Sequence, residues 1–580
     1  MKDELLIEKF TLLNAIKYKG KAELNSTLGA IIQSNPNEFK TRIPEIRSIL
    51  EKMIKIVNRM TIEEQRSRLL EIDPNSLKEE PKQKKEIKID LPNLERFKEV
   101  VLRLAPYPSG PLHIGNSRMV VLNDYCAKKY KGKLFLVFDD TIGSVTKIID
   151  PEAYDSIPEG LDFLGVKIHK TFYKSDRLSL FYKYAKDIIL KKKAYVCTCD
   201  GRKWRETYKV SKRNCPCRAL SIEENISRWE KMLDGTFPEQ GAVVRLITSM
   251  EDPDPAIRDP VMLRIAEREH PRVGTKYRVW PLLEFSWGID DHELGISHII
   301  RGKDLRKEGI LEQRIWQIYN WIEPSIILYG RMKLKDIQLS KSRSAKLIRD
   351  KIYQNWSDPR TWSLQSLNRR GIQPKAIHEA LLNFGISSVD ITFSPEHIHS
   401  TNRPLIDSNA NRFFMVVDPV NIIVNDVPED IRDSYPLIHP EFPERGTRKI
   451  NVVREGGKTS LLVPKEDIEE IGLNKVVRLK DLMNIVVKSY DKGDHPAGSA
   501  TFYSKDVSSA RKLQARMIQW VPHHSKIQVK ILMPNGNIIE GVAETGLKNA
   551  KVGQIIQFER FAFCRIEEIG KTVHLIWTHK

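Results

Sequence analysis

The sequence of 580 residues has no uninterrupted apolar run as long as the ~18 residues that a membrane-spanning helix needs. Its first residues, Met1-Lys2-Asp3-Glu4, lack the basic and apolar segments of a secretory signal peptide. The first absence excludes a membrane-spanning helix, and the second predicts a cytoplasmic protein. We therefore expect no membrane partner.

Acidic side chains are scarce relative to basic ones. Asp and Glu total 76 against 95 Lys and Arg, which gives a formal net charge of +19 and an isoelectric point near 9.4. A surface that only has to stay soluble does not need this imbalance, whereas a polyanion would use it through phosphate contacts and electrostatic steering. The composition therefore favours nucleic acid over a membrane as partner. The length suits about three to five domains and a monomer.

Residues 100–105 are apolar apart from Arg103 and partly β-branched, which predicts a buried parallel strand. A loop rich in Pro and Gly follows, and then a helix whose first turn carries His113, Gly115 and Asn116. A helix start attracts phosphate through its free N–H groups, Gly115 permits close approach, and His113 supplies a donor. Apolar side chains at three- and four-residue steps along this helix predict one core face: Met119, Leu122, Cys126 and Tyr130.

A second strand is expected at residues 133–139, and ligand groups belong at the carboxyl ends of such parallel strands. Far along the chain, the segment Leu339-Ser340-Lys341-Ser342 offers a matching half of a nucleotide site. If the fold brings this segment to His113, the chain is an ATP-dependent ligase. Taken alone, the first segment also fits a tight strand-to-helix turn with a solvated histidine.

Between about residues 196 and 297 the alternation of strands and helices breaks, which indicates an insertion. Its opening holds four of the six cysteines, in two close pairs: Cys197, Cys199, Cys215 and Cys217. Thiolates are preferred ligands of tetrahedral Zn²⁺, so we predict a structural zinc module. Four reduced core thiols, or disulfides, are the alternatives. We expect Cys126 and Cys564 to be packing residues.

The two ends of the chain have other patterns. Residues 1–75 predict two or three amphipathic helices, with one apolar stripe that begins at Leu5 and Ile7, and the Lys/Glu/Pro stretch 77–88 predicts a linker. From about residue 403 the pattern is β-rich, and Asn535-Gly536 between two alternating runs predicts a hairpin. The two halves of this region suggest paired β-barrels.

Segments 113–116 and 339–342 resemble the HIGH and KMSKS signatures of the class I aminoacyl-tRNA synthetases. Further segments are similar, in order, to the archaeal type of glutamyl-tRNA synthetase: 103–110, 138–141, 290–292, 299–304, 358–360 and 369–372. They cover most of the chain from about residue 95 onward. The resemblance implies a multidomain α/β plus β fold with a Rossmann-like catalytic domain and C-terminal paired β-barrels.

The patterns and the resemblance together predict six consecutive regions. They are an N-terminal helical extension with linker (1–94), the first half of the catalytic domain (95–195), an insertion that binds the tRNA acceptor end (196–297), the second half of the catalytic domain with the KMSKS-like loop (298–345), a helical region that contacts the tRNA stem (346–402) and anticodon-binding β-barrels (403–580). The candidate anticodon contacts are Arg412, Phe413, Phe414, Trp520, His523 and His524.

The implied activity joins L-glutamate to the 3′ end of tRNA(Glu) through a glutamyl-adenylate, with tRNA(Gln) as an open second acceptor. ATP with Mg²⁺ is implied, because the charge that builds on the phosphates calls for preorganised donors and a cation. The resemblance assigns catalysis to His113, Asn116 and Lys341, and ATP binding to these three with Gly115 and Ser340. Asn116 stands where the signature has its second histidine, so it donates a hydrogen bond but carries no charge.

For the amino acid, the resemblance implies a site made by Arg103, Ala105, Ser109, Asp139 and Arg301. The planar guanidinium of Arg103 matches the side-chain carboxylate, and Asp139 matches the α-ammonium. For Arg301 there are two expectations. It either binds the side-chain carboxylate of glutamate together with Arg103, or it pairs with a phosphate or with Asp304.

The chain departs from the family in this pocket. A Tyr commonly lies two residues after the proline that corresponds to Pro281, but this chain has Leu283 there and Trp287 four residues further on. A glutaminyl-tRNA synthetase and a catalytically inactive tRNA-binding paralogue are the alternatives. Residues 105–107, Ala-Pro-Tyr in place of the Pro-Pro-Glu usual in glutaminyl enzymes, favour glutamate, and the retained Lys341 favours an active enzyme.

Overall fold

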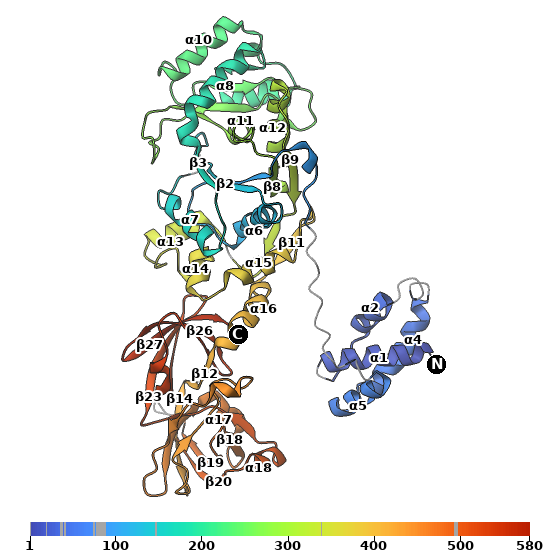
Figure 1. The fold of residues 1–580 in the computed structure, drawn as a ribbon, viewed down its shortest axis with the longest axis vertical. Helices are drawn as coiled ribbons and strands as arrows, with labels where there is room; N and C mark the ends of the chain where they lie inside the picture. Colours follow the sequence, from blue (N-terminus) through green and yellow to red (C-terminus); the bar gives the residue numbers. More distant parts are fainter. Residues whose placement is uncertain are drawn as a thin grey trace. The chain divides into compact units, whose positions relative to one another are not determined.

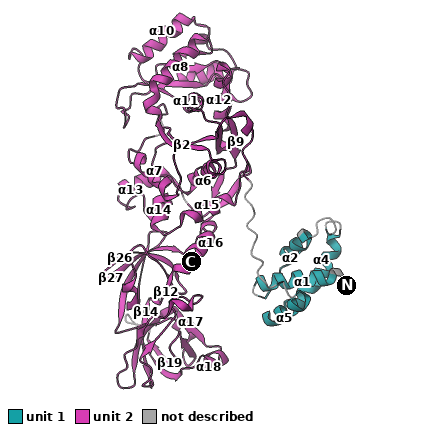
Figure 2. Cartoon of the chain, in the orientation of Figure 1, with its two compact units in different colours: residues 1–86 teal, residues 87–580 magenta. Residues whose placement is uncertain are grey.

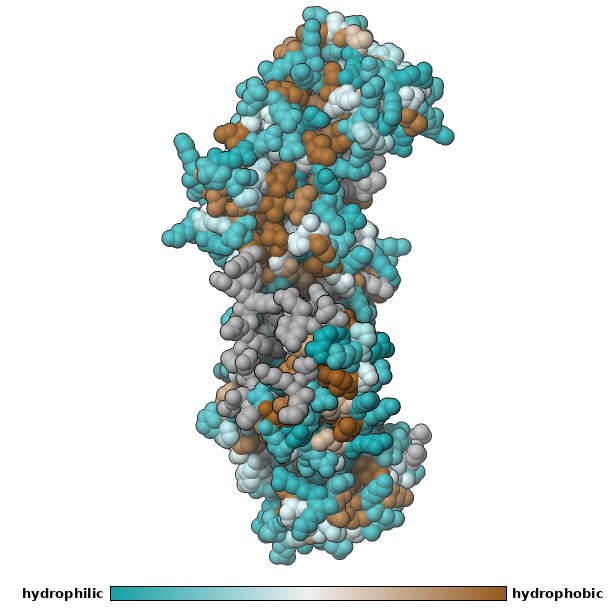
Figure 3. Space-filling model, turned by 90° about the vertical axis from the view of Figure 1, so that its right-hand side faces the viewer, coloured by the Kyte–Doolittle hydropathy of each residue, from teal (hydrophilic) through white to brown (hydrophobic). Residues whose placement is uncertain are grey.

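A computed structural model describes residues 2–18, 20–34, 39, 42–73, 76, 89–144, 148–337, 339–491 and 497–580 (Figure 1). The chain divides into two compact units, Met1–Glu86 and Ile87–Lys580 (Figure 2). The expected linker at 77–88 lies outside the described residues. Among the helices that are described, none has the length and apolar content to cross a membrane. Hydrophilic side chains cover much of the face in Figure 3, where apolar side chains lie in separate groups.

The described part of the first unit holds four helices, where the sequence predicts two or three. They are α1 (Lys2–Lys17), α2 (Leu24–Ser34), α4 (Ile43–Val57) and α5 (Ile62–Ile72), and α1 packs against the other three. Ile7, Leu12 and Leu50 lie in the packed interior. Leu5, which belongs to the same predicted stripe as Ile7, is instead 49% exposed.

A parallel sheet forms the centre of the second unit. Strands β1 (Val101–Leu104), β2 (Lys133–Phe138) and β3 (Lys170–Tyr173) pair in that order, and α6 (Ile114–Lys129) and α7 (Ala153–Phe163) connect them. β8 (His298–Gly302) and β9 (Ser325–Tyr329) form a second parallel pair, connected by α12 (Arg306–Tyr319). The backbone N–H of Ser297 donates to the carbonyl oxygen of Val101 at 2.9 Å and joins β8 to β1. The strands expected at residues 100–105 and 133–139 are confirmed.

Helix α6 is buried on more sides than its periodicity predicts. Ten of its residues are buried, including Arg118, Asn123 and Asp124. The sheet lies against α6, and α15 (Pro374–Leu382) packs on it as well. The prediction of a single core face is wrong, because a helix held between a sheet and another helix keeps little surface in contact with water.

The insertion carries an antiparallel sheet of four strands, at the top of Figure 1. The strands are β4 (Ala194–Cys197), β5 (Val243–Leu246), β6 (Val261–Ile265) and β7 (Val279–Pro281). Helix α8 (Leu178–Leu190) lies directly before the insertion, and α9 (Gly201–Trp204), α10 (Ile222–Leu233) and α11 (Leu283–Glu293) lie within it. The change from parallel to antiparallel pairing begins close to residue 196, where the sequence pattern breaks.

Helices follow the parallel strands. They are α13 (Lys341–Arg349), α14 (Leu364–Arg369), α15 and α16 (Pro395–Ile406). A short parallel pair joins β10 (Met332–Leu334), which precedes α13, to β11 (Ile391–Phe393), which precedes α16. Helix α13 has no buried residue. This helical stretch leads into the C-terminal strands (Figure 1).

Two seven-stranded, barrel-like sheets make up the C-terminal part. One has the order β21-β18-β19-β20-β14-β17-β22, and the other β12-β25-β26-β27-β23-β24-β13. In chain order the strands are β12 (Asn411–Phe413), β13 (Met415–Val417), β14 (Pro419–Asn425), β17 (Thr459–Pro464), β18 (Val476–Leu479), β19 (Asn484–Asp491), β20 (Ala497–Ser504), β21 (Arg516–Ile518), β22 (Val521–Pro522), β23 (Lys526–Leu532), β24 (Ile538–Glu544), β25 (Ile555–Phe558), β26 (Ala562–Ile569) and β27 (Thr572–His579). The backbone N–H of Met533 donates to the carbonyl oxygen of Asn537 at 2.8 Å, so the predicted hairpin is confirmed.

Candidate active site

The start of α6 carries the first predicted half of the nucleotide site. His113 is the residue before the helix, and its backbone N–H donates to Oδ1 of Asn116 at 3.4 Å. Gly115 lies against the His113 ring, since a Cβ at this position would be 2.9 Å from Cε1 of His113. The glycine therefore lets the imidazole fold back over the first turn of the helix.

A short backbone pairing holds this segment from the other side. The N–H of Ile114 donates to the carbonyl oxygen of Trp362 at 3.1 Å, and the N–H of Leu364 donates to that of Leu112 at 2.9 Å. Residues 362–364 belong to the stretch that follows Lys341 in the sequence. The His113 segment is thus fixed by residues about 250 positions later in the chain.

The second predicted half of the site lies beside the first. Lys341 is the first residue of α13, and its Nζ donates to the carbonyl oxygen of Gly110 at 3.2 Å. His113, Ser340 and Lys341 line a single pocket. The fold thus brings together the two segments that the sequence analysis pairs, while their roles in catalysis stay predictions.

The same pocket has walls that the signature motifs do not include: Pro111, Ser344, Trp356, Thr361 and Ser363. Trp356 lies against Gly110, whose φ of +128° excludes most side chains and where a Cβ would be 3.0 Å from the indole. Residues 358–360 are one of the segments that resemble the family, but the resemblance predicts that this region contacts the tRNA stem and not the nucleotide. Its proximity to His113 depends on long-range packing and is not visible in the sequence.

Burial shapes the charges of this pocket. It lowers the pKa of His113 to about 3, with a further contribution from the positive charge of Lys341, so the imidazole is neutral at pH 7. Nδ1 of His113 has no hydrogen-bond partner within the described part of the chain. Burial also lowers the pKa of Lys341 to about 8, where the ammonium still predominates at pH 7. Lys341 therefore supplies the positive charge, and His113 supplies a neutral donor or acceptor.

The charged residues predicted for the amino acid form buried ion pairs. Arg103 binds both carboxylate oxygens of Asp291, with Nη2 at 2.8 Å from Oδ2. Arg301 binds Glu312 through Nη1 and Nη2 at 2.8 and 2.9 Å. Glu312 on α12, and not Asp304, is the carboxylate partner of Arg301, so the expected pairing with Asp304 is wrong. A phosphate partner for Arg301 stays a prediction.

Asp139 and the two arginines meet around one indole ring. Asp139 pairs with Nζ of Lys174 at 2.8 Å. The ring centroid of Trp287 is 4.5 Å from Cζ of Arg103, 5.1 Å from Nζ of Lys174 and 5.3 Å from Cζ of Arg301. The sequence gives no sign of Lys174 as a partner, because it lies on the following strand-to-helix connection and belongs to no motif.

The remaining predicted pocket residues lie on neighbouring segments. Ala105 and Ser109 are half-buried on the loop between β1 and α6, and the N–H of Asp139 donates to the carbonyl oxygen of Pro106 in this loop at 3.1 Å. Leu283 is the first residue of α11 and is half-buried. The loop therefore lies next to the end of β2 that carries Asp139.

Asp140 ties the parallel sheet to the insertion. Its carboxylate accepts from the Ser175 hydroxyl at 2.7 Å and from the Tyr154 hydroxyl at 3.0 Å. Its backbone oxygen lies 2.7 Å from Nε2 of His270, a residue between β6 and β7. Burial raises the pKa of Asp140. Asp140, which follows Asp139 in segment 138–141, thus holds the parallel sheet and the insertion together. Nothing in that segment predicts this structural role.

The four predicted zinc ligands form one cluster. The Sγ atoms of Cys197, Cys199, Cys215 and Cys217 all lie within 4.8 Å of one another, and three of the pairs are 3.6 to 3.8 Å apart. These distances exclude disulfides, and all six cysteines are free. A tetrahedral site with Zn–S bonds of ~2.3 Å has edges of about 3.8 Å, which the cluster matches.

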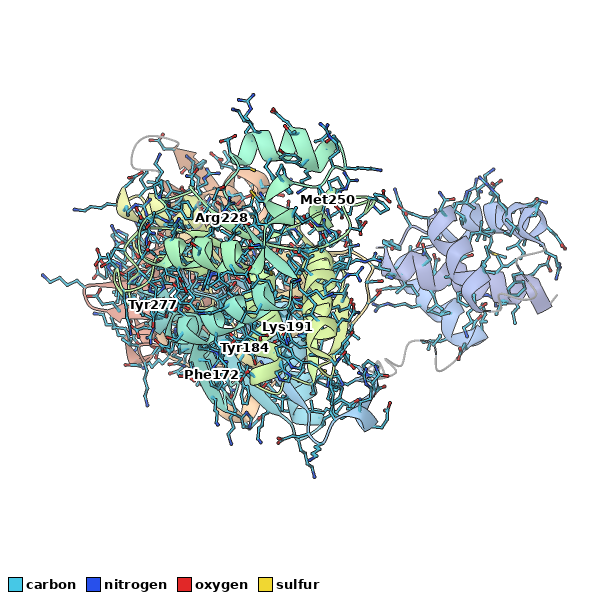
Figure 4. The ribbon with its side chains drawn as sticks, turned by 90° about the horizontal axis from the view of Figure 1, so that it is seen from above. Phe172, Tyr184, Lys191, Arg228, Met250 and Tyr277 are labelled. Carbon is cyan, nitrogen blue, oxygen red and sulfur yellow. The ribbon has the colours of Figure 1, made fainter. Side chains whose placement is uncertain are left out.

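Two of the side chains around this cluster are labelled in Figure 4. Nη1 of Arg228 lies 3.4 Å from Sγ of Cys217, and Met250 packs in the same apolar cluster as the cysteines. A cation beside the cluster offsets part of the negative charge that four thiolates would carry. Cys126 and Cys564 are buried elsewhere, as expected of packing residues.

Most of the candidate anticodon contacts are inside the barrel-like sheets. Arg412, Phe413, Phe414 and Trp520 are buried, so they are unable to stack on bases, and their assignment as contacts is wrong. The three aromatic side chains fill the cores of the sheets, which is the common place for such residues. Arg412 forms an ion pair with Asp407. His523 and His524 are exposed.

Comparison with known proteins extends these observations. Residues 99–407 match the family described as tRNA synthetases class I (E and Q), catalytic domain. Residues 410–502 and 517–567 match two families described as tRNA synthetases class I (E and Q), anti-codon binding domain.

Several relatives match over the whole chain. Glutamate–tRNA ligase of Methanocaldococcus jannaschii is 41% identical over 96% of each chain, and that of Pyrococcus furiosus is 40% identical over 100% of each. The crystal structure of glutamate-tRNA synthetase from Elizabethkingia anophelis is more distant, with 19% identity and a TM-score of 0.40 over 53% of this chain and 71% of that chain.

Proposed function

Because the chain belongs to the class I tRNA synthetases for glutamate and glutamine (E and Q), we propose that it joins L-glutamate to the 3′ end of tRNA at the expense of ATP. The observation that carries this proposal is the single pocket that His113 and Lys341 line. The names of the relatives, glutamate–tRNA ligase, support glutamate as the amino acid.

The proposed reaction has two steps. In the first, a carboxylate oxygen of the α-carboxyl group of glutamate attacks the α-phosphorus of ATP, and the bond to the β-phosphate breaks to release pyrophosphate. In the second, a terminal ribose hydroxyl of tRNA attacks the carbonyl carbon, and AMP leaves. Both steps depend on the position of the reactants and on compensation of phosphate charge. Mg²⁺, when bound with ATP, supplies part of this compensation.

The proposed roles follow from the charges of the pocket. The ammonium of Lys341 binds the β- and γ-phosphates as they leave the α-phosphate together as pyrophosphate. The neutral His113 donates a hydrogen bond from its ring to the phosphates. Oδ1 of Asn116 accepts a hydrogen bond from the backbone N–H of His113. Of the three proposed catalytic residues, Asn116 contributes least. Gly115 and Ser340 line the phosphate site, while Arg103, Ala105, Ser109, Asp139 and Arg301 surround the amino acid.

Charging of purified tRNAs tests the proposed function. We expect the protein with ATP and Mg²⁺ to attach labelled glutamate to tRNA(Glu), and to attach labelled glutamine more slowly or not at all. Parallel assays with tRNA(Gln) decide whether it is a second acceptor. Preference for glutamine would assign the chain to the glutaminyl enzymes, and no charging with either amino acid would indicate an inactive tRNA-binding paralogue.

We also propose that the cysteine cluster holds a structural Zn²⁺. Metal analysis of the purified protein should find about one equivalent of zinc. The substitution Cys199→Ser should lower the zinc content and destabilise the insertion, because a small module of this kind depends on its metal. Cys126→Ser is the matched control, a free thiol outside the cluster. A zinc-free protein whose insertion is as stable as before would contradict the proposal.

The proposed contacts with tRNA follow the six regions of the sequence analysis. The insertion (196–297) takes the acceptor end, the helical region (346–402) lies near the stem, and the C-terminal sheets (403–580) read the anticodon, in agreement with the two anticodon-binding families that match there. Region boundaries, monomeric state and cytoplasmic location stay predictions.

A further inference from the structure

Trp287 occupies the middle of the charged group that we propose for amino acid binding. It belongs to α11 and is only 4% exposed. Its ring lies near three cationic groups, those of Arg103, Lys174 and Arg301. Tryptophan has the most negative ring face of the side chains, so it holds these groups close to one another.

Each of the three cations already has a carboxylate partner. Asp291 pairs with Arg103, Asp139 with Lys174 and Glu312 with Arg301. The charges of these three pairs sum to zero. A further carboxylate that enters is therefore recognised by the hydrogen-bond donors that the pairs leave over, and not by an excess of positive charge.

Three N–H donors of this group are not used by the pairs. Nε1 of Trp287 is buried and has no hydrogen-bond partner in the described part of the chain, and the same holds for Nε of Arg301. Glu312 uses Nη1 and Nη2 of Arg301, and Asp291 uses Nε and Nη2 of Arg103, so Nη1 of Arg103 is not needed for its pair. A buried N–H without a partner is unfavourable, and a ligand that accepts its hydrogen bond removes this cost.

We propose that Trp287 is a specificity-determining residue, whose indole N–H donates to the side-chain carboxylate of the bound glutamate beside the guanidinium groups of Arg103 and Arg301. This inference rests on the proposed function. It gives the pocket a polar contact at Trp287, although Leu283 offers none at the position where relatives commonly have a tyrosine.

The donors also explain a preference for glutamate over glutamine. The indole N–H and the guanidinium N–H groups donate and never accept. Both oxygens of a carboxylate accept from such a set. The side-chain amide of glutamine has one oxygen and one NH₂ group, and the NH₂ group would face donors without an acceptor.

The substitution Trp287→Phe removes the N–H and keeps an aromatic ring for the cations. Steady-state charging of tRNA(Glu) should show a KM for glutamate that rises about tenfold or more, the size expected for a lost hydrogen bond to a charged group. The KM for ATP should not change, and the ratio of glutamate to glutamine charging should fall. An unfolded fraction would lower kcat and leave KM unchanged, so a folding defect does not imitate this result. Trp287→His, which restores a ring N–H, should recover part of the affinity.

Trp204→Phe is the matched control. Trp204 is also buried, its Nε1 also has no partner among the described residues, and its ring also lies under a guanidinium, that of Arg245 at 3.4 Å. It lies in α9 of the insertion, away from the predicted amino acid site, so its variant should keep the KM for glutamate.

Three results would overturn the inference. If the wild-type chain charges glutamate and Trp287→Phe has the same KM for glutamate, Trp287 makes no contact with the substrate. An equal rise in Trp204→Phe would show a general effect of losing a buried indole. A wild-type chain that charges no glutamate would overturn the proposed function and this inference together.

Discussion

Replacement of Lys341 by alanine should lower the rate of tRNA charging by about 100- to 1000-fold, the usual effect of removing one preorganised donor from a developing charge. The ammonium lies in the pocket of His113, 3.2 Å from the carbonyl oxygen of Gly110. We propose that the ammonium binds the β- and γ-phosphates as pyrophosphate separates from the α-phosphate in the transition state, so its loss should affect kcat more than the binding of the ground state.

The affinity for tRNA distinguishes this role from a structural one. Lys341 begins a helix without buried residues, so the substitution leaves the fold and the tRNA surface almost intact. Filter binding of tRNA should give nearly the same affinity for the variant and the wild type. Charging that stays at the wild-type rate would show that Lys341 does not act on the phosphates.

The pH dependence gives an independent check of the same side chain. Burial lowers the pKa of Lys341 to about 8, so the nucleotide-free protein loses this positive charge as the pH rises through 8. The value of kcat/KM for ATP, which reports the free enzyme, should therefore fall above pH 8. In Lys341→Arg the guanidinium stays charged, and this alkaline decrease should disappear. An unchanged decrease in that variant would assign it to another group.

The substitution Arg103→Met should both abolish charging and destabilise the protein. It leaves Asp291 as a carboxylate without its partner at a side-chain exposure of 0%. Breaking a buried ion pair from one side costs about 3–5 kcal/mol, because the remaining charge stays desolvated. Chemical denaturation should show this loss of stability, and charging assays should show the loss of activity.

A double variant separates the two effects. Arg103→Met with Asp291→Asn removes both charges of the pair, so most of the lost stability should return. Charging should not return, because the guanidinium that we propose for the glutamate carboxylate is still missing. A double variant that charges glutamate at the wild-type rate would show that Arg103 has only a structural part in the pair.

Local signals in the sequence account for much of the fold. The apolar run before residue 105 predicts β1, the Asn-Gly pair predicts the hairpin between β23 and β24, and the spacing of the four cysteines predicts their cluster. Each of these depends on residues close together in the sequence, whose preferences act directly on the backbone.

Contacts between residues far apart in the chain could not be predicted from the sequence. The partner of Arg103 lies 188 residues away, and although segment 290–292 resembles the family, nothing in it indicates that Asp291 pairs with Arg103. Burial of Phe414 and Trp520, which removes them from the anticodon contacts, depends on the closure of the C-terminal sheets. The same holds for Trp356, which lines the proposed nucleotide pocket next to residues 362–364, and these pair with the segment at the start of α6.

The two walls of the proposed nucleotide pocket differ in how firmly the fold holds them. His113 stands on α6, which has ten buried residues, whereas Lys341 stands on α13, which has none. Opening of a helix without buried contacts costs little free energy, while α6 is unable to shift without disturbing the core on several sides. We therefore expect α13 to make most of any movement that admits ATP to the pocket and releases AMP from it, while the His113 side stays fixed.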